Sequence, residues 1–165
     1  MRGECLGMRR QADELSKQEL EKLLHESEAR FQEVLQYSTE AAYKRNVQTA
    51  TYEYLSPVFL RISGYAPEAM MRWSMAELAG LIHPEDYPSA EQIMRESTNS
   101  ESGTTFHMEY RFKHKDGQYR WFHDQFTVLR DEAGMLLARV GSVREVAEQK
   151  RVEAACEHQL QFSEE

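Results

Sequence analysis

Apolar and polar residues alternate along the stretch TFHMEYRFKHKDGQYRWFHDQFTVL, residues 105–129. A repeat of two residues is typical of β-strands with one buried face, so this pattern predicts two strands. Residues 115–117 (Lys-Asp-Gly) separate them, and a three-residue loop that ends in Gly favours a type I turn with a bulge. The stretch therefore predicts an antiparallel hairpin. Its register pairs His114 with Gln118, Arg111 with Trp121, Tyr110 with Phe122, and Glu109 with His123.

One face of this hairpin is aromatic and apolar, and we expect it to lie in the core. It carries Phe106, Met108, Tyr110, Phe112, Phe122 and Phe126. Asp124 falls on the same face, where a carboxylate is costly unless it is paired. We interpret Asp124 either as a group that binds a cationic or polar ligand, or as one that reaches water or Arg120. A register shifted by one residue would exchange the two faces.

The segment before the hairpin predicts helices and two short strands. Residues 11–37 lack Pro and Gly, and one helical stripe follows 4-3-4-3 spacing: Leu20, Leu24, Ser27, Phe31 and Val34. The stripe predicts an amphipathic helix that pairs with a second copy or packs on its own domain. Residues 41–56 predict two strands, residues 57–63 a short helix that Gly64 ends, and residues 67–82 a broken helix. Asp86 is expected to cap the helix that contains residues 89–96.

The C-terminal part adds a strand and a helix. Residues 135–143 (MLLARVGSV) predict a strand, and the residues from Arg144 onward predict a polar helix. The complete order is a helix, two strands, several short helices, one longer helix, three strands and a helix. This order predicts an α+β fold, with one antiparallel sheet, helices over one of its faces and a helix at each end.

Composition narrows the classes of function. The 165 residues suit one domain with extensions, and the formal net charge of −8 argues against a nucleic-acid partner. No apolar run reaches about 18 residues, so we expect neither a membrane span nor direct membrane contact. Cys5 and Cys156 lie near the two ends without a CxxC motif. This placement favours free thiols and a cytoplasmic location.

Five stretches carry a family resemblance: YLSPVFLRISGYAPEAM, LIHPEDYPSA, MEYRFKHKDGQYRWF, LRDEAG and VGSVREVAEQKRVEA. Their order and spacing resemble a PAS domain of the bacterial sensory type. The resemblance implies a five-stranded antiparallel sheet with short helices over one face, in residues 28–145. Residues 1–27 would then form a helical linker suited to a coiled coil, and residues 146–165 a signalling helix.

The resemblance also implies a role. PAS domains sense and dimerise upstream of histidine kinases, diguanylate cyclases or further PAS domains, and a histidine kinase is our first expectation for the output domain. Two departures from the family pattern stand out. Residues 46–50 lack the usual Asp-Gly turn, so that hairpin tip is expected to be longer or irregular. Residues 145–147 read Glu-Val-Ala where the family usually has Asp-Ile-Thr.

Catalytic and cofactor signals are weak. No nucleophile stands beside a base in any known motif, so we expect a regulatory segment rather than an enzyme. His83 is interpreted as part of a helix start. The absence of Cys between residues 6 and 155 excludes the flavin–cysteine chemistry of photoreceptor relatives, and the long helix has no His for haem. Met94 is interpreted as a core residue rather than a haem ligand, and the identity of any cofactor stays open.

Three groups of residues form the candidate site. The expected ligand pocket contains Tyr43, Met94, Met108, Tyr110, Phe122 and Asp124. The outer face of the hairpin is expected to meet the N-terminal helix or a second subunit, or else to be solvated; it carries His107, Glu109, Arg111, Trp121 and His123. The expected signal relay contains Arg144, Glu145 and Lys150. The alternative function is a stand-alone protein that binds a small ligand or a cofactor.

Overall fold

The computed structural model describes the backbone of residues 2–146, with side chains from residue 16 onward. The chain divides into two compact units between Tyr37 and Ser38. The first unit contains one long helix, α1 (Arg2–Gln36), which begins earlier than the pattern of residues 11–37 predicts. The helix predicted from Arg144 onward is wrong for Arg144 and Glu145, which end a strand (Leu136–Glu145) because they pair with a neighbouring strand. The rest of that helix, from Ala147 on and including Lys150, lies outside the described residues.

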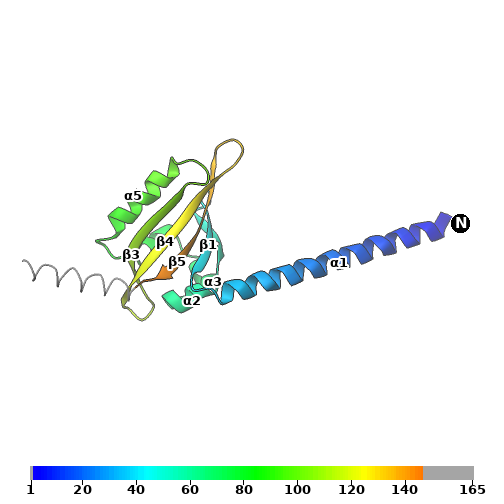
Figure 1. Ribbon diagram of the computed structural model, residues 1–165, viewed down its shortest axis with the longest axis horizontal. Helices are drawn as coiled ribbons and strands as arrows, with labels where there is room; N and C mark the ends of the chain where they lie inside the picture. Colours follow the sequence, from blue (N-terminus) through cyan, green and yellow to red (C-terminus); the bar gives the residue numbers. More distant parts are fainter. Residues whose placement is uncertain (1, 147–165) are drawn as a thin grey trace, which may run out of the picture. The chain divides into compact units, whose positions relative to one another are not determined.

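The second unit is built on a five-stranded antiparallel sheet (Figure 1). Its strands are β1 (Ala41–Asn46), β2 (Thr51–Leu55), β3 (Thr105–Lys113), β4 (Tyr119–Arg130) and β5 (Leu136–Glu145). They are arranged in the order β2-β1-β5-β4-β3, so the first and last strands in the chain meet in the middle of the sheet. This confirms the predicted α+β fold and its five-stranded sheet.

Short helices occupy the chain between β2 and β3. They are α2 (Val58–Ser63), α3 (Pro67–Met70), α4 (Met75–Ala79) and α5 (Tyr87–Thr98). Buried side chains of α2, α3 and α4, with Val58 and Leu78 among them, join Phe122 and Phe126 of the sheet in one core. The helices therefore cover one face of the sheet, as predicted.

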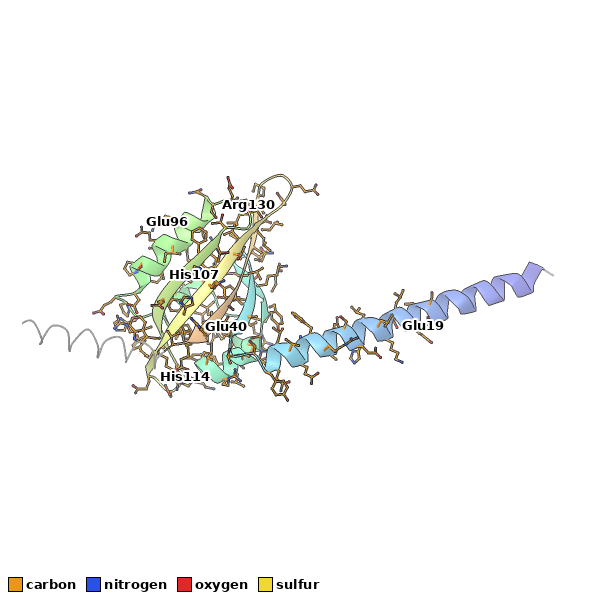
Figure 2. All side chains as sticks on the ribbon, viewed as in Figure 1. Glu19, Glu40, Glu96, His107, His114 and Arg130 are labelled. Atoms are coloured by element: carbon orange, nitrogen blue, oxygen red, sulfur yellow. The ribbon has the colours of Figure 1, made fainter. Side chains whose placement is uncertain are left out.

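The end of α2 shows why Gly64 is needed. Its backbone is left-handed, with φ of 78°, a conformation that favours glycine. A Cβ atom there would also lie 2.8 Å from the ring of His114, which is labelled in Figure 2. The close approach lets Lys115 donate a backbone hydrogen bond of 3.0 Å to Ser63. The β3–β4 turn is thereby attached to α2.

The register predicted for the β3–β4 hairpin is confirmed. Glu109 lies opposite His123 and Arg111 opposite Trp121, and Gly117 takes a φ of 89° in the turn. The predicted apolar face also lies in the core, because all of its members belong to the core cluster or pack against it. The β1–β2 connection is irregular, as expected, with a register shift opposite Lys44 and Arg45 that leaves Glu53 of β2 as the extra residue, and with a φ of 55° at Ala50.

The expected helix cap at Asp86 is wrong in its detail. Asp86 does stand at the start of α5, but its side chain makes no capping hydrogen bond. Instead its carboxylate accepts hydrogen bonds of 2.8 Å from both the backbone N–H and Nε of Arg111 on β3. The long guanidinium competes for the carboxylate, so Asp86 joins the start of α5 to the sheet.

Candidate functional site

A cavity of about 240 Å³ lies between the inner face of the sheet and the helices. Most of its lining is apolar or aromatic, as is usual for sites that take small organic ligands. The apolar lining residues are Phe59, Met70, Met75, Leu78, Ala79, Ile82, Ala90, Met94, Met108, Phe112 and Val143. The fold thus encloses space in the place where the sequence predicts a pocket.

Five of the six predicted pocket residues line this cavity, namely Tyr43, Met94, Met108, Tyr110 and Asp124. The sixth, Phe122, is not part of the lining. It is 2% exposed and stacks on Phe112 with 5.1 Å between the ring centroids. Phe122 therefore supports the cavity wall from within the core.

Asp124 is the buried polar centre of the cavity. It is 4% exposed, and its carboxylate accepts hydrogen bonds from the hydroxyl groups of Tyr43, at 2.9 Å, and Tyr110, at 3.2 Å. Burial raises the pKa of Asp124 to about 7, while the two hydrogen bonds act in the opposite direction. Asp124 neither reaches water nor pairs with Arg120, so these two alternatives are wrong.

The tyrosines around this carboxylate are neutral donors at physiological pH. Burial is the main cause that raises the pKa of Tyr43 and Tyr110 well above the ordinary value, and the charge of Asp124 adds to it. The same two causes raise the pKa of Tyr52 to about 12. The ring of Tyr52 meets that of Tyr43 edge to face, 5.8 Å away. These phenols can donate hydrogen bonds but do not ionise.

Two arginines in the lining, Arg45 and Arg139, were missed by the sequence analysis. They lie directly opposite each other on β1 and β5. Arg139 is 4% exposed, and a charged residue within the apolar run LLARVG was the signal that could have drawn attention to it. Arg45 gives no such signal, because it stands in the polar run YKRN.

The predicted outer face brings its polar residues together in pairs. The guanidinium of Arg111 lies 5.2 Å from the ring centre of Trp121, in cation–π geometry. Nδ1 of His123 lies 3.3 Å from the Glu109 carboxylate. The ring of His107, labelled in Figure 2, lies 5.6 Å from that of His123. The predicted cross-strand contacts are present on this face.

The predicted relay residues stand where β5 ends. Glu145 lies 3.6 Å from the guanidinium of Arg120 on β4. The next residue, Val146, is buried and donates a backbone hydrogen bond of 2.9 Å to Trp121. Arg144 is exposed and lies opposite His123. The sheet therefore holds the chain firmly up to the last described residue.

A model of the PAS fold family matches residues 52–143, which is more than half of the chain. The chain belongs to the PAS fold family. Among solved structures, the chain is similar to the N-terminal domain of a diguanylate cyclase with PAS/PAC sensor from Marinobacter aquaeolei. The two are 26% identical over 67% of this chain and 98% of that chain, with a TM-score of 0.61.

A second similar structure is a sensory box histidine kinase/response regulator from Burkholderia thailandensis. It is also 26% identical, over 82% of this chain and 98% of that chain, with a TM-score of 0.66. The PAS-B domain of Cycle from Drosophila melanogaster, solved with ethylene glycol, shares the fold at 12% identity, over 64% of this chain and 99% of that chain, with a TM-score of 0.54. None of the curated proteins matches the chain. The chain is thus a PAS sensory domain of a signalling protein.

Two further observations concern metal-ligand groups and membrane-spanning helices in this PAS domain. Within the described part of the chain, no group of three or more His, Cys, Asp or Glu side chains is placed to hold a metal ion. Among the same residues, no helix combines the length and apolar character needed to cross a bilayer.

Proposed function

We propose that this PAS domain is the sensory and dimerisation segment of a cytoplasmic signalling protein. A change within its cavity alters the conformation of its flanking helices, and these helices pass the signal to an output domain. The observation that carries the proposal is the 26% identity to two sensor domains, each matched over 98% of its own length. The segment itself acts as a regulator without catalytic activity.

The output domain that we favour is a histidine kinase. The histidine kinase neighbour matches 82% of this chain, compared with 67% for the diguanylate cyclase neighbour. A diguanylate cyclase or a protein with several PAS domains is the alternative. Phosphotransfer or cyclic dinucleotide synthesis by the whole protein would distinguish these outputs.

Dimerisation through α1 is supported by the exposure of its apolar stripe. The stripe residues Leu20, Leu24, Phe31 and Val34 are each more than half exposed. Together with Ser27 they follow a 4-3-4-3 spacing, which is the spacing that pairs helices in coiled coils. The outer sheet face, with Trp121 and Arg111, is the second surface that we assign to the dimer.

Light scattering on the full chain tests this dimer. Leu24→Asp and Phe31→Asp each place a charge on the stripe, and we expect both to lower the measured mass to that of a monomer. Ala29→Asp is the matched control, since Ala29 lies on the opposite side of α1 from Leu20 at 3.6 residues per turn. A wild-type chain that is monomeric, or stripe variants with unchanged mass, would contradict the proposed dimer.

A stand-alone ligand-binding protein is the second candidate, and the cavity with its buried Asp124 favours it. Such a protein would need neither a dimer nor an output domain. Native mass spectrometry of the purified chain separates the two candidates. A monomer that carries a bound small molecule would support the second candidate, whereas a dimer would support the sensory segment.

A further inference from the structure

Arg45 and Arg139 place two guanidinium groups on the inner face of the sheet. They are directly opposite residues of neighbouring antiparallel strands, and both line the cavity. Like charges at directly opposite positions destabilise a sheet, and burial weakens their screening by water. A pair of arginines in this arrangement therefore needs a compensating negative group.

Arg139 finds only partial compensation. Its Nε donates to Ser97 Oγ at 2.9 Å, and its Nη2 donates to the Met94 carbonyl at 3.0 Å. These partners lie near the C-terminal end of α5, where the helix dipole favours a cation. Its guanidinium also lies 5.9 Å from the ring centre of Phe126. All of these partners are neutral, so the charge of Arg139 is oriented but not neutralised.

Arg45 has no hydrogen-bond or ion-pair partner for its side chain among the described residues. Its Nε is buried and makes no hydrogen bond within the described part of the chain. The two acidic residues in the cavity lining are engaged elsewhere. Asp124 accepts hydrogen bonds from Tyr43 and Tyr110, and Glu91 lies 3.4 Å from Arg95. The arginine end of the cavity thus lacks an anion.

We propose that the cavity binds a small organic anion and that Arg45 and Arg139 hold its carboxylate or phosphate group. Guanidinium groups present paired N–H donors that match the oxygens of these anions, and such hydrogen bonds are stronger than neutral ones. The proposal rests on the proposed sensory function and names the chemical class of the signal. It also gives a reason for a buried Arg139 and a half-buried Arg45 beside a largely apolar core.

The cavity has a second polar end, which limits the length of the ligand. In the register of the sheet, Asp124 is level with Val143, four residues along β5 from Arg139. At about 3.3 Å per residue, the two ends are about 13 Å apart along the strand. Tyr43 and Tyr52 line the cavity as well. A ligand of a few carbon atoms would bind the arginines by its oxyanion and fill the apolar middle.

Isothermal titration calorimetry on the full chain tests the proposal. The probes are succinate, inorganic phosphate and the neutral compound butyramide, all at one ionic strength. We expect succinate or phosphate to bind saturably and butyramide not to bind, and the comparison of the first two separates a carboxylate from a phosphate ligand. We expect Arg45→Gln and Arg139→Gln each to raise the Kd about tenfold or more, since each removes charged hydrogen bonds.

Arg72→Gln is the matched control, because Arg72 is exposed and outside the cavity lining. It removes the same charge, and its Kd should stay within about twofold of the wild-type value. The proposal is overturned if neither oxyanion binds below about 10 mM, or if Arg45→Gln binds as tightly as the wild type.

A second readout, the melting temperature, needs no ligand. It tests the proposal even if the glutamine variants fold poorly. Arg45 makes no hydrogen bond within the described residues, so Arg45→Met should remove repulsion from Arg139 and raise the melting temperature by about 2–5 °C. A lower melting temperature would contradict the claim that the charge of Arg45 is uncompensated. Both measurements use the chain without an output domain. Their results therefore do not depend on whether the chain dimerises or relays a signal. Conversely, if no oxyanion binds, the proposed sensory function is unaffected, because the domain could still sense a neutral ligand.

Discussion

Tyr43 on β1 donates a hydrogen bond of 2.9 Å to the buried carboxylate of Asp124 on β4. The strand β5 lies between β1 and β4, so this bond crosses a whole strand. It passes over the inner face where Gly141, the partner of Tyr43 on β5, has no side chain. The polar centre of the cavity thus depends on three strands at once.

Asp124→Asn should remove a pH dependence from the stability of the domain. The pKa of Asp124 is about 7 in the folded chain and near 3.8 when exposed, so the folded state retains a proton that the unfolded state loses between these values. The stability contributed by this proton is complete below about pH 4 and is lost as pH rises to about 7. Relative to the variant, the wild type should lose up to about 1.4 kcal/mol per pH unit in this window. Urea denaturation at several pH values measures the difference.

Tyr43→Phe provides an independent check of this interpretation. The Tyr43 hydroxyl stabilises the charged form of Asp124, so its removal should raise the pKa of Asp124 further. The pH window of the stability loss should then extend to higher pH. A stability difference between wild type and Asp124→Asn that is constant from pH 4 to 7 would show that Asp124 titrates normally.

Gly141→Ala should destabilise the domain by about 1–3 kcal/mol, because overfilling a packed interior forces side chains and backbone to shift. A Cβ atom at this position would lie 2.3 Å from the backbone oxygen of Gln125 and 2.8 Å from Cβ of Phe126. Gly80→Ala is the control, since the nearest atoms there are backbone oxygens at 3.4 Å. Thermal unfolding of both variants measures the contrast. Equal melting temperatures would mean that β5 can move away from β4 at little cost.

Asp86→Asn should weaken the link between α5 and β3. The Asp86 carboxylate accepts hydrogen bonds from the Arg111 guanidinium and backbone, and its side chain is 14% exposed. Loss of these charged bonds should lower the free energy of unfolding by about 1–3 kcal/mol at pH 7. Glu85→Gln is the control. Glu85 contacts the same guanidinium but is 73% exposed, so its effect should be clearly smaller.

The effect of Asp86→Asn should also disappear in acid. The hydrogen bonds from Arg111 hold the pKa of Asp86 below its ordinary value of 3.8. A depressed pKa contributes stability above the unfolded value, and this stability is lost as pH falls through the folded pKa. Wild type and variant should therefore converge once the pH falls below the depressed pKa of Asp86. A difference that persists there would assign the effect to packing rather than to charge.

Local sequence patterns predicted the parts of the fold that local chemistry determines. The Lys-Asp-Gly turn and the alternation around it were enough to place Asp124 on the inner face and Arg111 opposite Trp121. The position of Gly64 likewise indicated where α2 ends. In each case the deciding residues lie within a few positions of one another. The register of the hairpin follows directly from its turn.

The arrangement of the cavity required information that no local pattern contains. Arg45 and Arg139 meet only because β1 pairs with β5, a contact between distant parts of the chain. The same holds for Asp86. Its carboxylate could have capped α5, but it binds Arg111, which β3 places beside it. Long-range pairing and the competition between partners decided these contacts, so the sequence alone could not predict them.

Glu145→Ala should uncouple the relay without unfolding the domain. The Glu145–Arg120 pair has a distance of 3.6 Å, and both side chains are about 30% exposed, so its loss should cost less than about 1 kcal/mol. Arg120 would keep its second partner, Asp116, at 3.0 Å. The backbone bond from Val146 to Trp121 would also remain, so the sheet should stay intact.

The measurement for this variant is a fusion of the chain to a histidine kinase output domain, with autophosphorylation as the readout. We expect Glu145→Ala to reduce the response to an added ligand while the melting temperature changes by less than about 3 °C. Glu132→Ala is the matched control, because Glu132 is an exposed acid between β4 and β5 and takes no part in the Glu145–Arg120 pair. A fusion that responds normally with Glu145→Ala would show that the signal reaches the expected C-terminal signalling helix without this ion pair. The backbone pairing of β4 with the end of β5, which includes Phe122 opposite Glu145 and the Val146 to Trp121 hydrogen bond, would then carry the connection.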